Sequence, residues 1–119
     1  MSGKSIATDN RSGAKLSKDR KYRYRLWRAW NIDKPAVAFI MLNPSTADET
    51  DDDPTIRRCL GYAKDWGYGS LIVGNLFAYR TSNPSGLRKC KDPIGPENNE
   101  RLQSICNDSD LVEIGRAHV

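Results

Sequence analysis

Two asparagines associated with apolar runs are the residues of this chain best suited to chemistry. Asn43 follows the run Ala36 to Leu42, and Asn75 interrupts the run Ser70 to Tyr79. A carboxamide both donates and accepts hydrogen bonds, so it can orient a water molecule or read the edge of a nucleobase. The alternatives are structural: Asn43 could satisfy its own backbone in an Asx-type turn, and Asn75 could be a core residue bonded to a neighbouring loop.

Buried strands would have to position these two side chains. Pro44 restricts Asn43 to extended backbone conformations and turns the chain sharply after the first run. Open α/β sheets bind their ligands at the carboxyl ends of the strands, so we expect both carboxamides to face one crevice there. The candidate catalytic residues are Asn43 and Ser45. The candidate substrate-binding residues are Asn75, Phe77, Tyr79 and Arg80. In the second set, an aromatic ring could stack on a flat ligand and the arginine could meet a phosphate.

An acidic segment follows the first strand, with five carboxylates in the six positions from Asp48 to Asp53. Oxygen ligands of this kind can hold Mg²⁺ for phosphoryl chemistry. We predict a site without metal, and a metal bound by Asp48, Asp51 and Asp52 is the weaker alternative. The simpler interpretation is that Asp53 caps a helix that starts at Pro54 and that the other acids are solvated. We predict no cofactor.

The net charge of +4 is unevenly distributed along the chain. Residues 1–34 contain ten Lys and Arg residues against three acids, a net charge of +7, which leaves −3 for the remainder. A basic segment of this kind can contact a phosphate backbone, and the candidate nucleic-acid-binding residues are Arg23, Arg25 and Arg57. The alternative is a solvated face with a loose tail. DNA or a nucleotide is therefore the expected partner.

Hydrophobic patterning predicts an α/β fold with three layers, α/β/α, around a mostly parallel sheet. We expect an edge strand at 22–30, a buried strand at 36–42, a helix from 54, a second buried strand at 70–79, a long loop at 80–95, a helix from 96 and a third inner strand at 110–114. Parallel strands would be joined by right-handed crossovers.

The 119 residues fit one small domain. We expect a disordered basic tail at 1–20, a single incomplete α/β domain at 21–112, and a non-native tail at 113–119. No apolar run is long enough to span a membrane, no secretory signal is visible, and three widely spaced cysteines are typical of reduced thiols. We therefore expect a cytoplasmic protein without membrane contact. The oligomeric state cannot be derived.

Three segments closely resemble a bacterial and phage family, domain-of-unknown-function family 1643. They are MLNPSTADETDDDPTIRRC, NLFAYRTSNP and DPIGPENNERL. The resemblance extends from about Tyr24 to Val112. It implies no established activity.

The strand followed by Asn43-Pro44-Ser45 also resembles, more distantly, the first motif of uracil-DNA glycosylases. That resemblance implies a glycosylase-like fold, a water-positioning role for Asn43, and base recognition by Asn75. Ser45 stands where those enzymes have glycine, and their later His-Pro motif would fall beyond Val112. The function that follows is a nucleobase-recognising DNA glycosylase-like hydrolase, inactive in this fragment. The alternatives are a non-catalytic nucleic-acid-binding module, a Mg²⁺-dependent phosphohydrolase that uses the acidic segment, and a protein-interaction domain.

Overall fold

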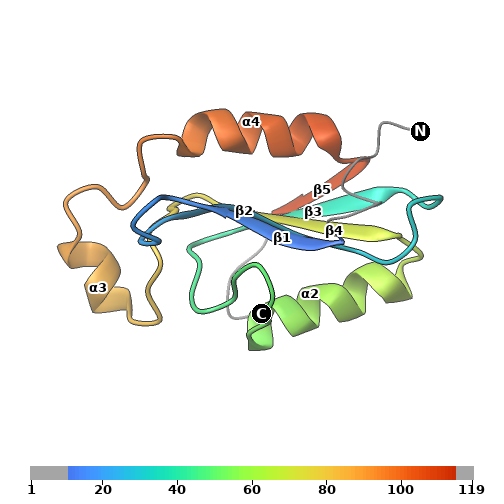
Figure 1. The fold of residues 1–119 in the computed structure, drawn as a ribbon, viewed down its shortest axis with the longest axis horizontal. Helices are drawn as coiled ribbons and strands as arrows, with labels where there is room; N and C mark the ends of the chain where they lie inside the picture. Colours follow the sequence, from blue (N-terminus) through green and yellow to red (C-terminus); the bar gives the residue numbers. More distant parts are fainter. Residues whose placement is uncertain (1–10, 115–119) are drawn as a thin grey trace.

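A single five-stranded sheet organises the computed structural model, which describes residues 11–114. The strands are β1 (Ser12–Leu16), β2 (Arg23–Ala29), β3 (Ala36–Met41), β4 (Ser70–Asn75) and β5 (Leu111–Ile114). They are arranged in the order β1-β2-β4-β3-β5 (Figure 1). β2 runs antiparallel to both β1 and β4, whereas β3 runs parallel to both β4 and β5.

The predicted mostly parallel, three-layer α/β/α sheet is therefore wrong. The sheet is mixed, because two of its four strand pairings are antiparallel, and only three short helices accompany it in the part of the chain described. β2 is also not an edge strand. β1 pairs with its outer side, in a segment for which the sequence predicted a disordered tail. The sequence did not predict β1 because its residues, SGAKL, have almost no apolar pattern. The pairing of β1 with β2 depends on main-chain bonds and on Gly13, which leaves room for the ring of Trp27.

Helices α2 (Pro54–Asp65) and α4 (Asn98–Asp108) pack on opposite faces of the sheet, and α3 (Pro84–Lys89) lies beyond its end (Figure 1). The predicted start of α2 is confirmed, with Pro54 in the first turn and the Asp53 carboxylate accepting the Ile56 N–H. Gly67, just after α2, has a φ of 86°, which favours glycine. α3 falls inside the segment predicted as a loop, and α4 begins two residues later than predicted.

The two faces of the sheet have separate cores. On the α2 side, Val37, Phe39, Leu71 and Val73 pack with Ile56, among others. On the α4 side, a smaller cluster comprises Ala38, Ile40, Ile72 and Ile105. β3 and β4 contribute to both clusters, which confirms that the runs predicted as buried strands are apolar on both faces.

The last strand includes two residues of the predicted non-native tail. Glu113 and Ile114 lie in β5, where they pair in parallel with Phe39 and Ile40. The rest of the predicted non-native tail, residues 115–119, lies outside the described residues, as does the first half of the predicted basic tail.

Candidate functional site

The structure places Asn43 and Asn75 at the same edge of the sheet. β3 and β4 are adjacent and parallel, with Met41 opposite Asn75, so the chain leaves both strands at one end. Both asparagines line a single cavity of about 30 Å³. That volume is enough for a water molecule, but it is far below the roughly 300 Å³ at which small-molecule sites begin. A nucleobase does not fit between these two side chains.

The bonds of both carboxamides stabilise the local fold. The Asn43 side-chain amide donates to the carbonyls of Pro44 (3.0 Å) and Thr81 (2.8 Å), which joins the segments that follow β3 and β4. Asn75 is 2% exposed, and its Oδ1 accepts a hydrogen bond from Arg23. These contacts agree with the structural alternatives that the sequence left open for the two residues.

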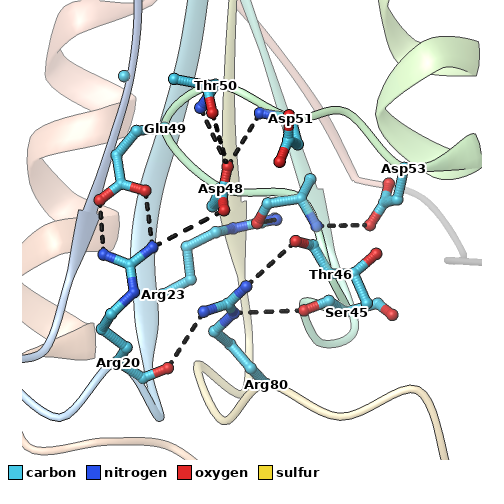
Figure 2. Close-up of polar contacts among 12 residues, drawn as sticks. Arg20, Arg23, Ser45, Thr46, Asp48, Glu49, Thr50, Asp51, Asp53 and Arg80 are labelled. Carbon is cyan, nitrogen blue, oxygen red and sulfur yellow. Dashed lines mark hydrogen bonds and ion pairs between the residues drawn. The ribbon is translucent and has the colours of Figure 1, made fainter.

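Four arginines from β2, from the turn before it and from the chain after β4 hold the loop between β3 and α2 (residues 42–53, the β3–α2 loop). Three of them donate to its main-chain carbonyls: Arg80 to Ser45 and Thr46, Arg23 to Ala47, and Arg28 to Asp48 and Asp51. The fourth, Arg20, forms a two-pronged ion pair with Glu49, with both N–O distances at 2.7 Å. Figure 2 shows Arg20, Arg23 and Arg80 reaching this loop. Guanidinium groups therefore fix the path of a loop that has no regular structure of its own.

Two of the predicted metal ligands, Asp48 and Asp52, have carboxylates engaged in local bonds. Asp48 accepts the N–H groups of Asp51 and Thr50, and the first of these is the main cause that lowers its pKa. The Asp52 carboxylate pairs with Arg28 at 2.9 Å. No group of three potential ligands in residues 11–114 is arranged to hold a metal ion. The geometry therefore favours the capping interpretation over a magnesium site.

Asp53 has a double role, because it caps α2 and also holds the β3–α2 loop. One carboxylate oxygen accepts the Ile56 N–H at 2.9 Å and the other accepts the Ala47 N–H at 3.2 Å. We expect Asp53→Ala to lower the free energy of unfolding by about 1 kcal/mol or more, measured by urea denaturation, since it removes a helix cap and a loop contact. Asp53→Asn should lose less, because asparagine also caps helices. Equal stability of all three proteins would contradict this role.

The three arginines predicted to bind nucleic acid do not share a surface. Arg23 is 2% exposed, and burial lowers its pKa to about 10, so it remains charged inside the protein but cannot reach a phosphate. Arg25 pairs with Asp108 of α4 at 2.7 Å. Arg57 is exposed on α2 and donates to the carbonyl of Asp52.

A larger groove lies beside the small cavity, at the same edge of the sheet. Its volume is about 560 Å³ and it is open to solvent. We call it the edge groove, and its lining residues are Arg20, Lys21, Ser45, Thr46, Tyr79, Arg80, Thr81 and Ser82. Three residues predicted for the site, Ser45, Tyr79 and Arg80, therefore meet here, whereas Phe77 does not line the groove. Sequence reasoning missed Arg20 and Lys21 because they lie in the turn after β1, a strand it did not predict.

The edge groove is positively charged and rich in hydroxyl groups. Arg20, Lys21 and Arg80 line it, and no carboxylate does. Arg80 donates to the carbonyls of Arg20, Ser45 and Thr46, and among the ion pairs found in residues 11–114 none involves it. The hydroxyls of Ser45 and Ser82 are hydrogen-bonded to each other across the groove. Arg80 thus uses three of its five N–H groups on carbonyls, while its charge has no ion-pair partner in residues 11–114.

Comparison with known proteins adds one assignment. A family model described as "Protein of unknown function (DUF1643)" matches residues 23–115. The chain belongs to this family. No curated protein and no solved structure matches it. The comparisons give no support to a uracil-DNA-glycosylase relationship or to a bacterial or phage origin.

In residues 11–114, no helix has both the length and the apolar character needed to cross a membrane. Membership in DUF1643 assigns no activity, so a function has to be argued from the site.

Proposed function

We propose that this DUF1643 domain binds the phosphate groups of DNA or of a nucleotide in the edge groove. The observation that carries the proposal is the set of three cationic side chains around an open groove that contains no acidic lining residue. Arginine and lysine form the charge-assisted bonds that bind phosphates in proteins, and hydroxyl groups add further donors. Ser45, Thr46 and Ser82 supply those hydroxyls, whereas the Thr81 hydroxyl donates to the Asn83 carbonyl.

The size of the edge groove suits one nucleotide. Its volume of about 560 Å³ lies within the range of small-molecule sites. The half-buried Tyr79 ring lies in its wall and is held edge-on by Tyr22, with ring centroids 5.9 Å apart. An aromatic ring fixed in this way can stack on a base of any sequence. Phosphate binding without base-specific readout is therefore the mode of recognition that we propose.

The geometry supports binding better than it supports hydrolysis. N-glycosidic hydrolysis by Asn43 and Asn75 requires a base-sized space between them, and the cavity there has a volume of about 30 Å³. Metal-assisted phosphohydrolysis by Asp48, Asp51 and Asp52 requires converging carboxylates, but the Asp48 carboxylate accepts N–H groups of the loop and the Asp52 carboxylate pairs with Arg28.

Lys21 offers the cleanest test, because it is exposed in the edge groove and its side chain makes no hydrogen bond or ion pair found in residues 11–114. We expect Lys21→Ala to weaken binding of a fluorescein-labelled single-stranded oligonucleotide about threefold at low salt, and to reduce the slope of log K against log salt by about 0.7. Fluorescence anisotropy titrations at several salt concentrations measure both quantities. Unlabelled AMP added as a competitor tests whether a single nucleotide is sufficient.

The matched control is Lys34→Ala. Lys34 is also exposed, but it lies before β3, at the opposite edge of the sheet. Both variants remove one positive charge, so a general effect of net charge would weaken binding equally in the two. Equal affinities of the two variants, or no binding by the unchanged protein, would contradict the proposed function.

A further inference from the structure

The ion pair between Arg20 and Glu49 engages one of the three cations that line the edge groove, and Glu49 itself is not a lining residue. Both guanidinium NH groups of Arg20 point at the two Glu49 carboxylate oxygens, each at 2.7 Å (Figure 2). A phosphate accepts the same two parallel bonds from an arginine. The carboxylate of Glu49 therefore sits where a phosphate bound to Arg20 would place its oxygens.

The backbone at Arg20 presents this guanidinium to the groove at a conformational cost. Arg20 has a φ of 63°, and no other residue except glycine has a positive φ in the described part of the chain. A left-handed conformation is unfavourable for a side chain of this kind, and glycine or asparagine is the usual choice in such a turn. The Arg20 carbonyl accepts a bond from Arg80, so this turn joins two of the three cations in the groove.

The pair is also exposed enough to open. The Arg20 side chain is 49% exposed and the Glu49 side chain 42%. Exposed ion pairs contribute little to stability, so exchanging one anion for another at Arg20 leaves the fold intact. Arg23 contrasts with it, because its guanidinium is buried and bonded to Asn75 and Ala47.

We propose that Glu49 is an internal competitor for the phosphate site: its carboxylate occupies the guanidinium of Arg20 until a ligand phosphate displaces it. This inference rests on the proposed function and adds a regulatory residue to it. Of the three cations in the edge groove, the Lys21 side chain makes no hydrogen bond or ion pair found in residues 11–114, and Arg80 donates only to carbonyls. Arg20 alone pairs with carboxylates there: closely with Glu49, at 2.7 Å, and more distantly with Asp48, at 3.8 Å. Binding therefore includes one exchange step, in which the Arg20–Glu49 pair breaks and an Arg20–phosphate pair forms.

Competition by Glu49 should not depend on pH near neutrality. The hydrogen bonds from Arg20 lower the pKa of Glu49 to about 2, so the carboxylate is ionised throughout the range from pH 5.5 to pH 8. A change in pH within that range cannot relieve the competition, whereas removal of the carboxylate can.

The test compares Glu49→Gln with the unchanged protein by anisotropy, with the same labelled oligonucleotide. We expect the dissociation constant to decrease about threefold, as the weakness of exposed ion pairs suggests, and by the same factor at pH 5.5 and pH 8. The matched control is Glu97→Gln. Glu97 also pairs with an arginine, Arg101, at 3.0 Å. This pair lies across the first turn of α4, and neither residue lines the edge groove. The control corrects for the general gain from removing one negative charge.

A double-mutant cycle identifies Arg20 as the group released. Arg20→Gly removes the guanidinium and suits the left-handed backbone, so the variant should fold, which a thermal melt verifies. In the Arg20→Gly background, Glu49→Gln should bring no gain in affinity. If Glu49→Gln gains no more than Glu97→Gln while Lys21→Ala still weakens binding, the competitor role is wrong and the proposed function stands. If no variant binds the oligonucleotide or AMP, both fail.

Discussion

Arg23→Met should lower the free energy of unfolding by about 3 kcal/mol, the typical cost of removing one partner from a buried charge network. Arg23 is 2% exposed, and its guanidinium donates to the Ala47 carbonyl and to Asn75 Oδ1, both at 3.2 Å. Methionine fills part of the same volume but supplies no donor. Both acceptors would be left unpaired, and each buried unpaired acceptor costs about 1–3 kcal/mol.

The charge of Arg23 matters as well as its hydrogen bonds. Burial lowers its pKa to about 10, and the strongest opposing influence is the negative charge of Asp53, which is itself 7% exposed. At neutral pH, Arg23 therefore remains charged and balances a buried carboxylate. Its replacement would leave Asp53 without that balance, although two backbone N–H groups still bond to it.

Arg25→Met is the matched control, since it is the same substitution two residues further along β2. Arg25 pairs with Asp108, whose side chain is 51% exposed, and pairs near the surface contribute about 1 kcal/mol or less. Urea denaturation of both variants measures the difference. Arg23→Lys should show an intermediate loss, because it keeps the charge and loses the planar fork. Equal stabilities of Arg23→Met and Arg25→Met would show that the buried arginine is dispensable.

The elements with strong local signals are those that the sequence predicted correctly. Asp53-Pro54 combines a capping side chain with a residue suited to the first turn, and α2 begins there. The apolar runs near Ala36 and Ser70 became β3 and β4, which lie side by side and in parallel. In both cases the information lies within a few consecutive residues.

The direction and order of strands are not encoded in this local way. The alternating polar pattern of Arg23 to Ala29 indicated a strand with one solvated face, but two of its arginines, Arg23 and Arg28, are buried. They are buried because carbonyls of the β3–α2 loop, far along the chain, accept their hydrogen bonds. β2 was predicted as an edge strand, but β1 pairs with its outer hydrogen-bonding side.

The candidate site shows the same division. The pairing of β3 with β4 brought Asn43 and Asn75 to one cavity, as the sequence predicted, but the size of that cavity depends on Arg23 and Asp53, which also line it. The edge groove is assembled from three distant segments: the turn at 20–21, the β3–α2 loop at 45–46, and the chain after β4 at 79–82. No spacing rule within one segment could have predicted it.

Arg80→Gln should weaken binding of the labelled oligonucleotide about tenfold, which corresponds to about 1.4 kcal/mol. Arg80, like Lys21, has no acidic partner among the ion pairs of residues 11–114, so its loss removes a charge that the ligand would neutralise. Lys21→Ala should have the smaller effect, because a mobile ammonium loses more conformational entropy on binding than a guanidinium already held by three carbonyls. Anisotropy titrations at low salt measure both.

Arg80 also holds the β3–α2 loop, so loss of charge has to be separated from loss of loop contacts. Arg80→Lys serves this purpose, since lysine keeps the positive charge but cannot reproduce the three bonds that Arg80 makes to the carbonyls of Arg20, Ser45 and Thr46. Thermal melts should show both variants losing stability by similar amounts. Affinity should differ between them, with Arg80→Lys remaining within about threefold of the unchanged protein, because phosphate binding depends mainly on charge. If both variants bind equally weakly, the loop geometry determines affinity, and if both bind as well as the unchanged protein, the edge groove is not the phosphate site.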